Sequence, residues 1–293
     1  MIGAIIINNK YGLAQKKIDH KTSRLTEEFS KLDVEIDVIK NDGHLFKLVN
    51  GELVSNIKPY NFIIYLDKDI YTAVSLKKLG YRLFTDPSFI ALCDDKLLTH
   101  ISISGLGIPT PNIISAPLSF YKEDEDIDND FINKVIDQLG LPAIFKTVHG
   151  SLGQGVELLN SKEEALLTYR KYKGTPCFFQ QYVDSLSSSI RVLVLDKKIV
   201  TIICRKNESD FRSNSVNGNG HSYLYSPSDE LLEDVKKLIE YFDIEYAGID
   251  FIVDEKGNHY FLEMNSNAFF SEAEKVSNIN IAALIANYLI HQK

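Results

Sequence analysis

Residues 248–267 read GIDFIVDEKGNHYFLEMNSN. Residues 248–253 and 259–264 are rich in β-branched and aromatic side chains, and the polar residues between them are typical of a turn. The stretch therefore predicts a β-hairpin. The other candidate functional residues all precede it in the chain.

Two acids and an amide interrupt the apolar pattern of this hairpin. Alternation along a strand puts Asp250 on one face with Gly248 and Ile252, while Glu263 and Asn265 share a face of the second strand. A carboxylate among apolar neighbours is costly to bury unless it is compensated. Oxygen ligands from adjacent strands suit Mg²⁺, which prefers carboxylates together with substrate phosphates. From the hairpin alone, a metal site and an edge hairpin with solvent-facing acids are equal alternatives.

Composition limits the class of protein. A length of 293 residues with 44% hydrophobic residues predicts two or three compact units. The net charge of −8 argues against a nucleic-acid or anionic-membrane surface as the main partner. Cys93, Cys177 and Cys204 lack metal-type spacing and are expected to be buried, inert thiols. The apolar N-terminus has no basic leader and is too short for a membrane span, so a cytoplasmic protein is expected.

The first 90 residues alternate between strand and helix patterns, which predicts a small α/β domain. The dipeptide Asn50-Gly51 predicts a short β-ribbon within it. Strands are expected at residues 2–7, 34–39, 62–66 and 82–84, and helices at residues 22–31 and 70–79.

The middle of the chain begins with Asp86-Pro87-Ser88, which predicts the start of one helix running to about residue 104. Residues 105–111 then form a linker. Six acids in residues 123–130 predict a solvated loop. Further elements are a helix at 131–139, strands at 143–147 and 156–159 joined by a glycine-rich loop, and a helix ending near residue 172.

From residue 177 onward the pattern is that of an antiparallel sheet. Strands are expected at residues 177–183, 190–195 and 198–204, followed by a polar segment at 205–221, a helix at 228–242, the hairpin, and a last helix at 279–290.

The loop at residues 150–155 offers backbone N–H groups that side chains would not shield, as a phosphate-binding loop requires. Lys146 lies four residues before it. The spacing matches neither the P-loop nor the dinucleotide fingerprint. A flexible surface hairpin is the alternative for this loop.

Arg191, Arg205, Arg212 and Asn214 form a second candidate cluster. Arginine is favoured where a planar fork must bind a carboxylate or phosphate through two hydrogen bonds. Several arginines around one polar segment, followed by an Asp/Glu/Asn set, are hard to explain as surface residues alone.

The order of these motifs resembles the ATP-grasp superfamily, and within it most closely the RimK-like α-L-glutamate ligases, from about residue 87 to the C-terminus. The motifs in order are Asp95-Lys96, Lys146, the 150–155 loop, Gln180-Gln181-Tyr182-Val183, Arg191, Arg205, Phe211-Arg212-Ser213-Asn214, Gly248-Ile249-Asp250 and Leu262-Glu263-Met264-Asn265. The resemblance implies an α/β, α+β architecture with a pre-ATP-grasp domain at 1–90, a small central lobe at 91–175 and a C-terminal lobe at 176–293.

The resemblance also implies a role for each site residue. Lysines would contact ATP phosphates, the glycine loop would close over them, residues 181–183 would hold the adenine, and Arg212 and Asn214 would line the phosphate side. The expected ATP-binding set is Lys96, Lys146, Gly150, Ser151, Gly153, Gln154, Gly155, Gln181, Tyr182, Val183, Ser189, Arg212 and Asn214. The catalytic arginines would be Arg191, Arg205 and Arg212, and the ligands of Mg²⁺ (or Mn²⁺) would be Asp250, Glu263 and Asn265.

The implied reaction is ATP-dependent ligation of a carboxylate to an amine through an acyl-phosphate. The implied partners are an amino-acid donor, such as glutamate, and a small-molecule, peptide or protein C-terminal carboxylate; a homo-oligomer is compatible with the family. Cationic side chains and metal would offset the charge of ATP during phosphoryl transfer. The alternative is a non-catalytic nucleotide-binding sensor or scaffold with the same fold.

Three positions depart from the family pattern. Ser189 stands where an acid usually holds the ribose, and Gln181 where an acid is common near the adenine. Residues 266–270 replace a turn of small residues and proline next to the expected acceptor pocket.

Overall fold

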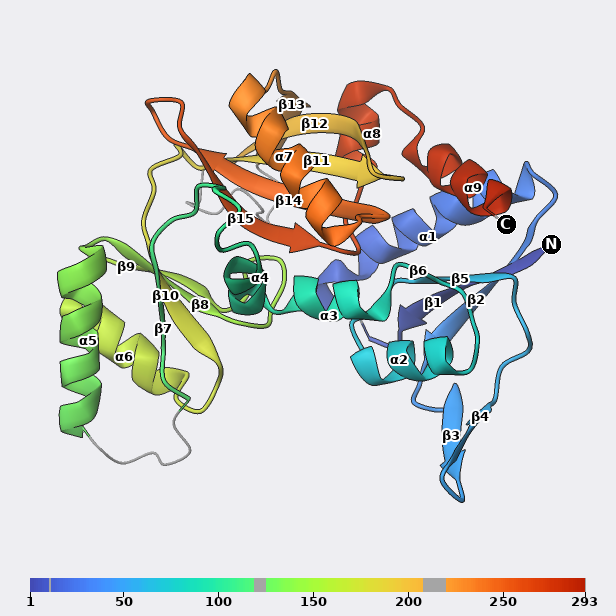
Figure 1. Ribbon diagram of the computed structural model, residues 1–293, viewed down its shortest axis with the longest axis horizontal. Helices are drawn as coiled ribbons and strands as arrows, with labels where there is room; N and C mark the ends of the chain where they lie inside the picture. The colour runs from blue at the N-terminus through green and yellow to red at the C-terminus, as the bar shows by residue number, and fades with distance from the viewer. Residues whose placement is uncertain (11, 119–124, 208–219, 293) are drawn as a thin grey trace.

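A computed structural model describes the whole chain except residues 11, 119–124, 208–219 and 293 (Figure 1). Arg212 and Asn214 therefore lie outside the described residues. Three sheets and one short ribbon make up the β-structure of the described chain. Among the described residues, no helix is long and apolar enough to cross a membrane.

The N-terminal sheet is parallel and has the order β2-β1-β5-β6. Helices α1 and α2 pack against it, and the predicted strand–helix alternation is confirmed. Its interior strand β1 is apolar because both faces are covered. The elements are β1 (Ile2–Asn8), η1 (Gly12–Ala14), α1 (Gln15–Ser30), β2 (Glu35–Asn41), β5 (Phe62–Tyr65), α2 (Ile70–Lys78) and β6 (Leu83–Phe84).

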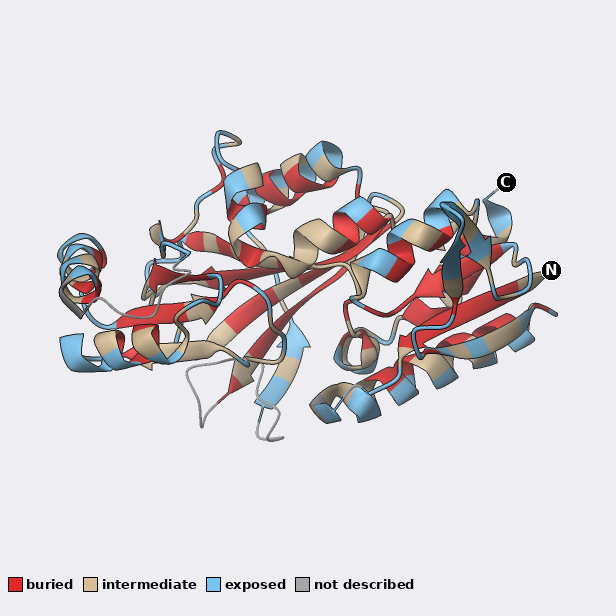
Figure 2. Ribbon diagram, turned by 90° about the horizontal axis from the view of Figure 1, so that it is seen from below, coloured by how far each residue is buried: buried red, intermediate tan, exposed pale blue. Residues whose placement is uncertain are grey.

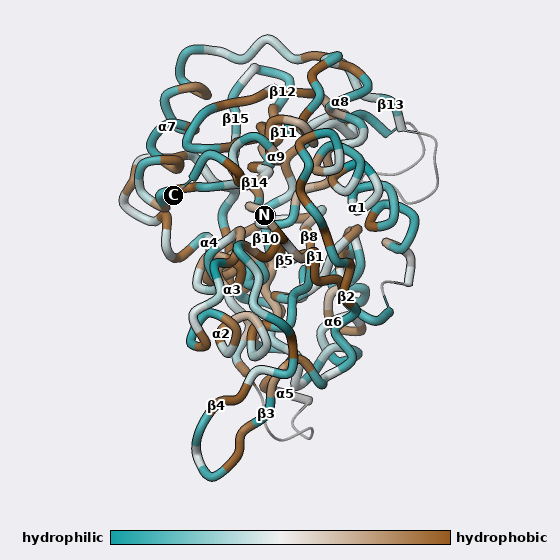
Figure 3. The backbone as a smooth tube through the Cα atoms, turned by 90° about the vertical axis from the view of Figure 1, so that its right-hand side faces the viewer, coloured by the Kyte–Doolittle hydropathy of each residue, from teal (hydrophilic) through white to brown (hydrophobic). Residues whose placement is uncertain are grey.

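The predicted ribbon around Asn50-Gly51 is present as β3 (Phe46–Val49) and β4 (Glu52–Ser55). It projects away from the rest of the molecule (Figure 3).

The single helix expected from residue 86 to 104 is wrong, because two helices occupy this region. They are α3 (Pro87–Asp94) and α4 (Lys96–Ser102). Asp95 between them has an extended backbone, and its side chain accepts a hydrogen bond from the Leu98 N–H at 2.7 Å. Asp95 is thus the N-cap of a second helix, and this places Lys96 at the first turn.

The second sheet is antiparallel with the order β7-β10-β8-β9. Its elements are β7 (Ile113–Ser115), α5 (Glu125–Leu139), β8 (Ala143–Thr147), β9 (Val156–Leu159), α6 (Lys162–Lys171) and β10 (Cys177–Gln181). Because β10 belongs to this sheet, the sheet extends beyond the predicted lobe boundary at 175; the boundaries themselves remain predictions.

The described part of the acidic run, residues 125–130, is not the predicted solvated loop, because α5 begins at Glu125. Asp128 is buried, and the ammonium of Lys173 lies 3.0 Å from its Oδ1. An ion pair from a distant segment thus allows one acid of the run to face the core.

The third sheet has the order β13-β12-β11-β14-β15 and carries the predicted hairpin as its β14–β15 edge. Asp250 and Glu263 lie opposite each other across this hairpin, as do Gly248 and Asn265. The elements are β11 (Ser188–Leu195), β12 (Lys198–Asn207), β13 (Gly220–Leu224), α7 (Asp229–Phe242), β14 (Tyr246–Val253), β15 (His259–Asn265), α8 (Ser271–Ser277) and α9 (Ile281–His291).

The first and third sheets share a hydrophobic core. Helix α9, at the C-terminal end of the chain, packs beside α1 of the N-terminal unit (Figure 1). The rings of Phe84 and Tyr246 make a tilted contact across the two units, with centroids 5.5 Å apart. Buried residues run along the strands of these sheets, and exposed ones lie on the outer helix faces (Figure 2). The N-terminal unit is therefore fixed against the sheet that carries Asp250 and Glu263.

Candidate active site

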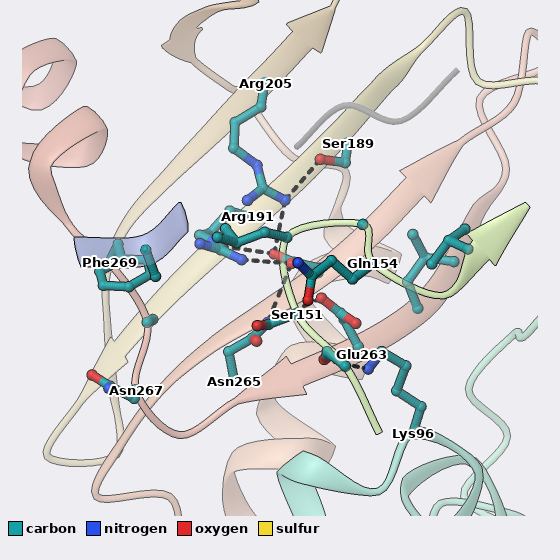
Figure 4. Close-up of a pocket in the computed structure, with 18 of the residues that line it drawn as sticks. Lys96, Ser151, Gln154, Ser189, Arg191, Arg205, Glu263, Asn265, Asn267 and Phe269 are labelled. Carbon is teal, nitrogen blue, oxygen red and sulfur yellow. Dashed lines mark hydrogen bonds and ion pairs between the residues drawn. The ribbon is translucent and has the colours of Figure 1, made fainter. Parts of the chain in front are cut away.

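A cavity of about 520 Å³ lies where the three sheets meet. Part of its lining is drawn in Figure 4. The predicted site residues that line it are Lys96, Lys146, Gly150, Ser151, Gly153, Gln154, Tyr182, Val183, Ser189, Arg191, Arg205, Asp250, Glu263 and Asn265. Gly155 and Gln181 are not among the lining residues.

Two lysines stand on one side of the cavity, Lys96 buried and Lys146 partly buried. The Lys96 ammonium donates to the Gly150 carbonyl oxygen at 2.8 Å, and the Lys146 ammonium donates to Gln180 Oε1 at 2.8 Å. Burial lowers the pKa of Lys146 to about 8, although nearby Glu263 opposes the shift. Neither lysine forms a close ion pair among the described residues, so both ammonium groups suit an anionic ligand.

Gln180 is a site residue that the sequence-based prediction missed. It is buried and lines the cavity, whereas the side chain of Gln181 accepts a hydrogen bond from the Asn112 N–H at 3.4 Å. Side chains alternate along β10, so only one of the two glutamines can face Lys146. The pairing of Phe178 with Lys146 across the two strands shows that Gln180 is the one. The alternation of side chains along the strand was the sequence signal that could have identified Gln180.

The glycine loop joins β8 to β9 and closes one side of the cavity. Gly155 has φ +70°, and a Cβ there would lie 2.1 Å from Thr147 Oγ1. The Thr147 N–H also donates to the Gly155 carbonyl at 2.9 Å. Gly155 therefore permits the close approach that shapes the loop, and the neighbouring residues Gly150, Ser151 and Gly153 line the cavity.

Three charged side chains form the opposite wall. Arg191 donates to Asp250 Oδ1 through Nε at 2.8 Å and to Oδ2 through Nη2 at 2.7 Å, and Arg205 Nη2 lies 3.2 Å from Oδ1. Arg205 Nη2 also donates to Ser189 Oγ at 2.8 Å. Burial raises the pKa of Asp250, but the two guanidinium groups outweigh burial and hold it below its ordinary value. Two buried arginines facing one aspartate leave positive charge on this wall.

The predicted metal ligands converge. Asn265 Nδ2 lies 3.4 Å from Asp250 Oδ2 and 3.3 Å from Glu263 Oε1. Oδ2 of Asp250 accepts one hydrogen bond from Arg191, and the side-chain amide of Asn265 approaches the same oxygen. If the amide is turned so that its oxygen faces the acids, each of the three side chains offers an oxygen. This donor set fits Mg²⁺.

Metal ligation by these three residues remains a prediction. No group of three or more His, Cys, Asp or Glu side chains suited to a metal occurs in the described parts of the chain. A cation here would therefore depend on the amide of Asn265 and on substrate phosphates.

The far end of the cavity is formed by residues to which the sequence-based prediction gave no role, although it expected residues 266–270 next to the acceptor pocket. Asn8 is the last residue of β1 and Lys10 follows it, Asp67 and Lys68 follow β5, and Asn267 and Phe269 follow β15. Ligands commonly bind outside the carboxyl ends of parallel strands. The strand ends at residues 8 and 66 were the signal that could have located this part of the site.

A family model described as a RimK-like ATP-grasp domain matches residues 93–289. The chain belongs to the RimK-like ATP-grasp family.

Three relatives and one solved structure illustrate the similarity. The chain is 26% identical over 285 residues to uncharacterized protein MG012 of Mycoplasma genitalium, which covers 95% of this chain and 96% of that protein. It is 26% identical to human β-citrylglutamate synthase B, over 87% of this chain and 66% of that protein. It is 25% identical to the glutamate–LysW ligase ArgX of Sulfolobus acidocaldarius, over 77% and 79% of the two chains. D-alanine–D-alanine ligase of Bacillus anthracis shares the fold, with a TM-score of 0.74, 19% identity and coverage of 99% and 96%.

Family membership confirms two expectations from the sequence. The mixed α/β ATP-grasp fold is one, and an ATP-dependent ligase of the ATP-grasp class is the other. Proteins of this family use ATP with Mg²⁺. The role of each named residue remains a prediction.

Proposed function

We propose that this protein joins an acceptor carboxylate to the amino group of an amino acid, with glutamate as the donor, at the expense of ATP. The observation that carries the proposal is the arrangement of one cavity. Lys96 and Lys146 stand on one side, and Arg191 and Arg205 stand on the other with Asp250, Glu263 and Asn265. The names of two relatives, β-citrylglutamate synthase B and glutamate–LysW ligase, support glutamate as the amine.

In the first step, an acceptor carboxylate oxygen attacks the γ-phosphorus of ATP, and the bond to the β,γ-bridging oxygen breaks. An acyl-phosphate and ADP result. Lys96 and Lys146 would hold the phosphates, since an ammonium fixed in a poorly solvated site stabilises negative charge without reorganisation. Mg²⁺ held by Asp250, Glu263 and Asn265 would supply further charge neutralisation when bound.

In the second step, the amine attacks the carbonyl carbon. The carbon–oxygen bond to phosphate breaks, the phosphate leaves with the electron pair, and the nitrogen loses a proton. Arg205 suits the acyl-phosphate, because it lines the cavity and its guanidinium carries several N–H donors. Arg191 lies on β11, next to the strand that carries Arg205. Asp250 binds both guanidinium groups and keeps them oriented. Catalysis would rest on positioning and electrostatics.

The test is to measure ADP formation with ATP and Mg²⁺, glutamate, and a panel of acceptor carboxylates that includes citrate, and to identify products by mass spectrometry. Amide products heavier than the acceptor by one glutamyl residue, which is glutamate less one water, are expected, and Asp250→Asn should abolish them. If ATP binds by calorimetry but no acceptor gives ADP, and Asp250→Asn behaves like the wild type, the ligase proposal fails and the nucleotide sensor is favoured.

A further inference from the structure

Lys21 is a buried lysine to which the proposed reaction assigns no role. It lies on α1 of the N-terminal unit and is 3% exposed. Among the described residues it has no carboxylate partner; its ammonium donates to Asn267 Oδ1 at 2.7 Å and to the Ala268 carbonyl oxygen at 2.9 Å. It also lies over the ring of Tyr246, 4.8 Å from the centroid.

The segment that Lys21 holds is part of the cavity wall. Residues 266–269 follow directly from Asn265 and line the cavity. In Figure 4, Asn267 and Phe269 lie on the same side of the site as Arg191 and Asn265. They are also where this chain departs from the family pattern. The segment is therefore placed to contact the acceptor, beyond the predicted metal ligands.

Other contacts fix the same segment from further directions. Asn267 Nδ2 donates to the Leu66 carbonyl oxygen at 2.7 Å, at the carboxyl end of β5. The Tyr246 hydroxyl donates to the Ala268 carbonyl oxygen at 2.7 Å. With Lys21, these bonds tie the segment to the N-terminal sheet and to β14. Lys21 adds two further bonds, and among the described residues its side chain is the one that bonds both Asn267 and Ala268.

An ammonium is an unusual choice for this position. Burial, and secondly the positive charge of Arg191, lower the pKa of Lys21 to about 7. A methionine of similar length would fill much of the same space without that desolvation cost. The feature that methionine cannot reproduce is the pair of hydrogen bonds to Asn267 and Ala268.

We propose that Lys21 is a positioning residue, which holds residues 266–270 in the shape that receives the acceptor and so determines acceptor specificity from behind the cavity wall. The inference rests on the proposed ligase function and on the expectation that the acceptor pocket lies next to residues 266–270. Lys21 does not line the cavity itself, so its effect passes through Asn267 and Ala268.

The experiment compares Lys21→Met, Lys21→Arg and Lys16→Met. Lys16 is an exposed lysine on the same helix and serves as the matched control. For the acceptor that gives the wild type most ADP, Lys21→Met should raise KM about tenfold or more, while the ATP dissociation constant changes less than about twofold. Lys21→Arg, which keeps the charge and several donors, should recover part of the loss.

A second measurement does not depend on turnover. In hydrogen–deuterium exchange, backbone amides at 265–270 should exchange faster in Lys21→Met than in the wild type, while those at 143–159 should be unchanged. If the wild type shows no ligase activity, the proposed function fails and this measurement alone decides whether Lys21 orders the segment.

Two results would overturn the inference. One is a folded Lys21→Met protein with unchanged acceptor KM and unchanged exchange at 265–270. The other is an equal loss of ATP and acceptor binding, which would indicate a general structural role. If Lys21→Met does not fold, Asn267→Ala removes one of the same hydrogen bonds, and it should also raise the acceptor KM selectively; an unchanged KM would count against the proposal.

Discussion

Arg191 binds both carboxylate oxygens of Asp250, at 2.8 and 2.7 Å, from the residue directly opposite on the neighbouring strand. Both side chains are largely buried, so the pair is shielded from water. The contact joins the predicted catalytic wall to the predicted metal site, and the orientation of one group depends on the other.

Asp250→Asn should therefore destabilise the protein as well as abolish ligation, because it leaves Arg191 and Arg205 buried without a counter-charge. Removing one partner of a buried ion pair typically costs about 3–5 kcal/mol in the free energy of unfolding. Urea denaturation measures this. The control is Asp196→Asn, whose pair with Lys198 is on the surface and should contribute less than about 1 kcal/mol. Equal stability of the two variants would contradict the prediction.

Gln180→Leu should weaken ATP binding about tenfold, a cost of about 1.4 kcal/mol, because the Lys146 ammonium loses the acceptor that fixes it. Calorimetry with ATP and Mg²⁺ measures the change. Gln181→Leu is the matched control and should have a smaller effect, since its side chain does not line the cavity. The reverse order would favour the sequence-based assignment of the Gln181 side chain.

Gly155→Ala should impair ATP binding through the glycine loop, because the added Cβ would meet Thr147 Oγ1 at 2.1 Å. Gly257→Ala is the control: its φ of +86° is as unfavourable for alanine, but the position is open. Both variants should lose about 1 kcal/mol in the free energy of unfolding from backbone strain. Only Gly155→Ala should also raise the ATP dissociation constant, measured by calorimetry; matching values would argue against a role of this contact in shaping the loop.

Lys21 should make the free energy of unfolding depend on pH. Its pKa is about 7 in the folded protein and 10.5 in the unfolded chain. Between these values the unfolded chain binds a proton that the folded protein lacks, so stability rises with pH across this window. The lowered pKa of Lys146 has an effect of the same sign on stability. This contribution is the same in the wild type and in Lys21→Met, so it cancels when the two are compared.

Denaturation of the wild type and of Lys21→Met at about pH 6.5 and about pH 9 checks this expectation. The wild type should gain stability relative to the variant at the higher pH. A difference that stays constant with pH would show that Lys21 titrates near its ordinary value when folded.

Several elements could be predicted because their signals are local. The hairpin was predicted from β-branched strands around a polar turn, and the N-terminal α/β unit from its alternating apolar runs. One error arose because a distant residue decides the outcome, and the other because a local helix cap was not recognised. Lys173 allows Asp128 to be buried in a helix, and the Asp95 cap divides a continuous helical pattern into two helices.

The sequence by itself determined the fold class and the family, because the order of a lysine, a glycine loop, arginines and an Asp/Glu/Asn set is a property of the chain. Most of the site residues that it predicted line the cavity. Only the tertiary structure decided that Gln180 and not Gln181 faces Lys146, since this depends on the register between β8 and β10. It also decided that Lys21 reaches Asn267, 246 residues further along the chain. No local pattern encodes such contacts, because they form only when separately folded units pack together and bury the polar groups between them.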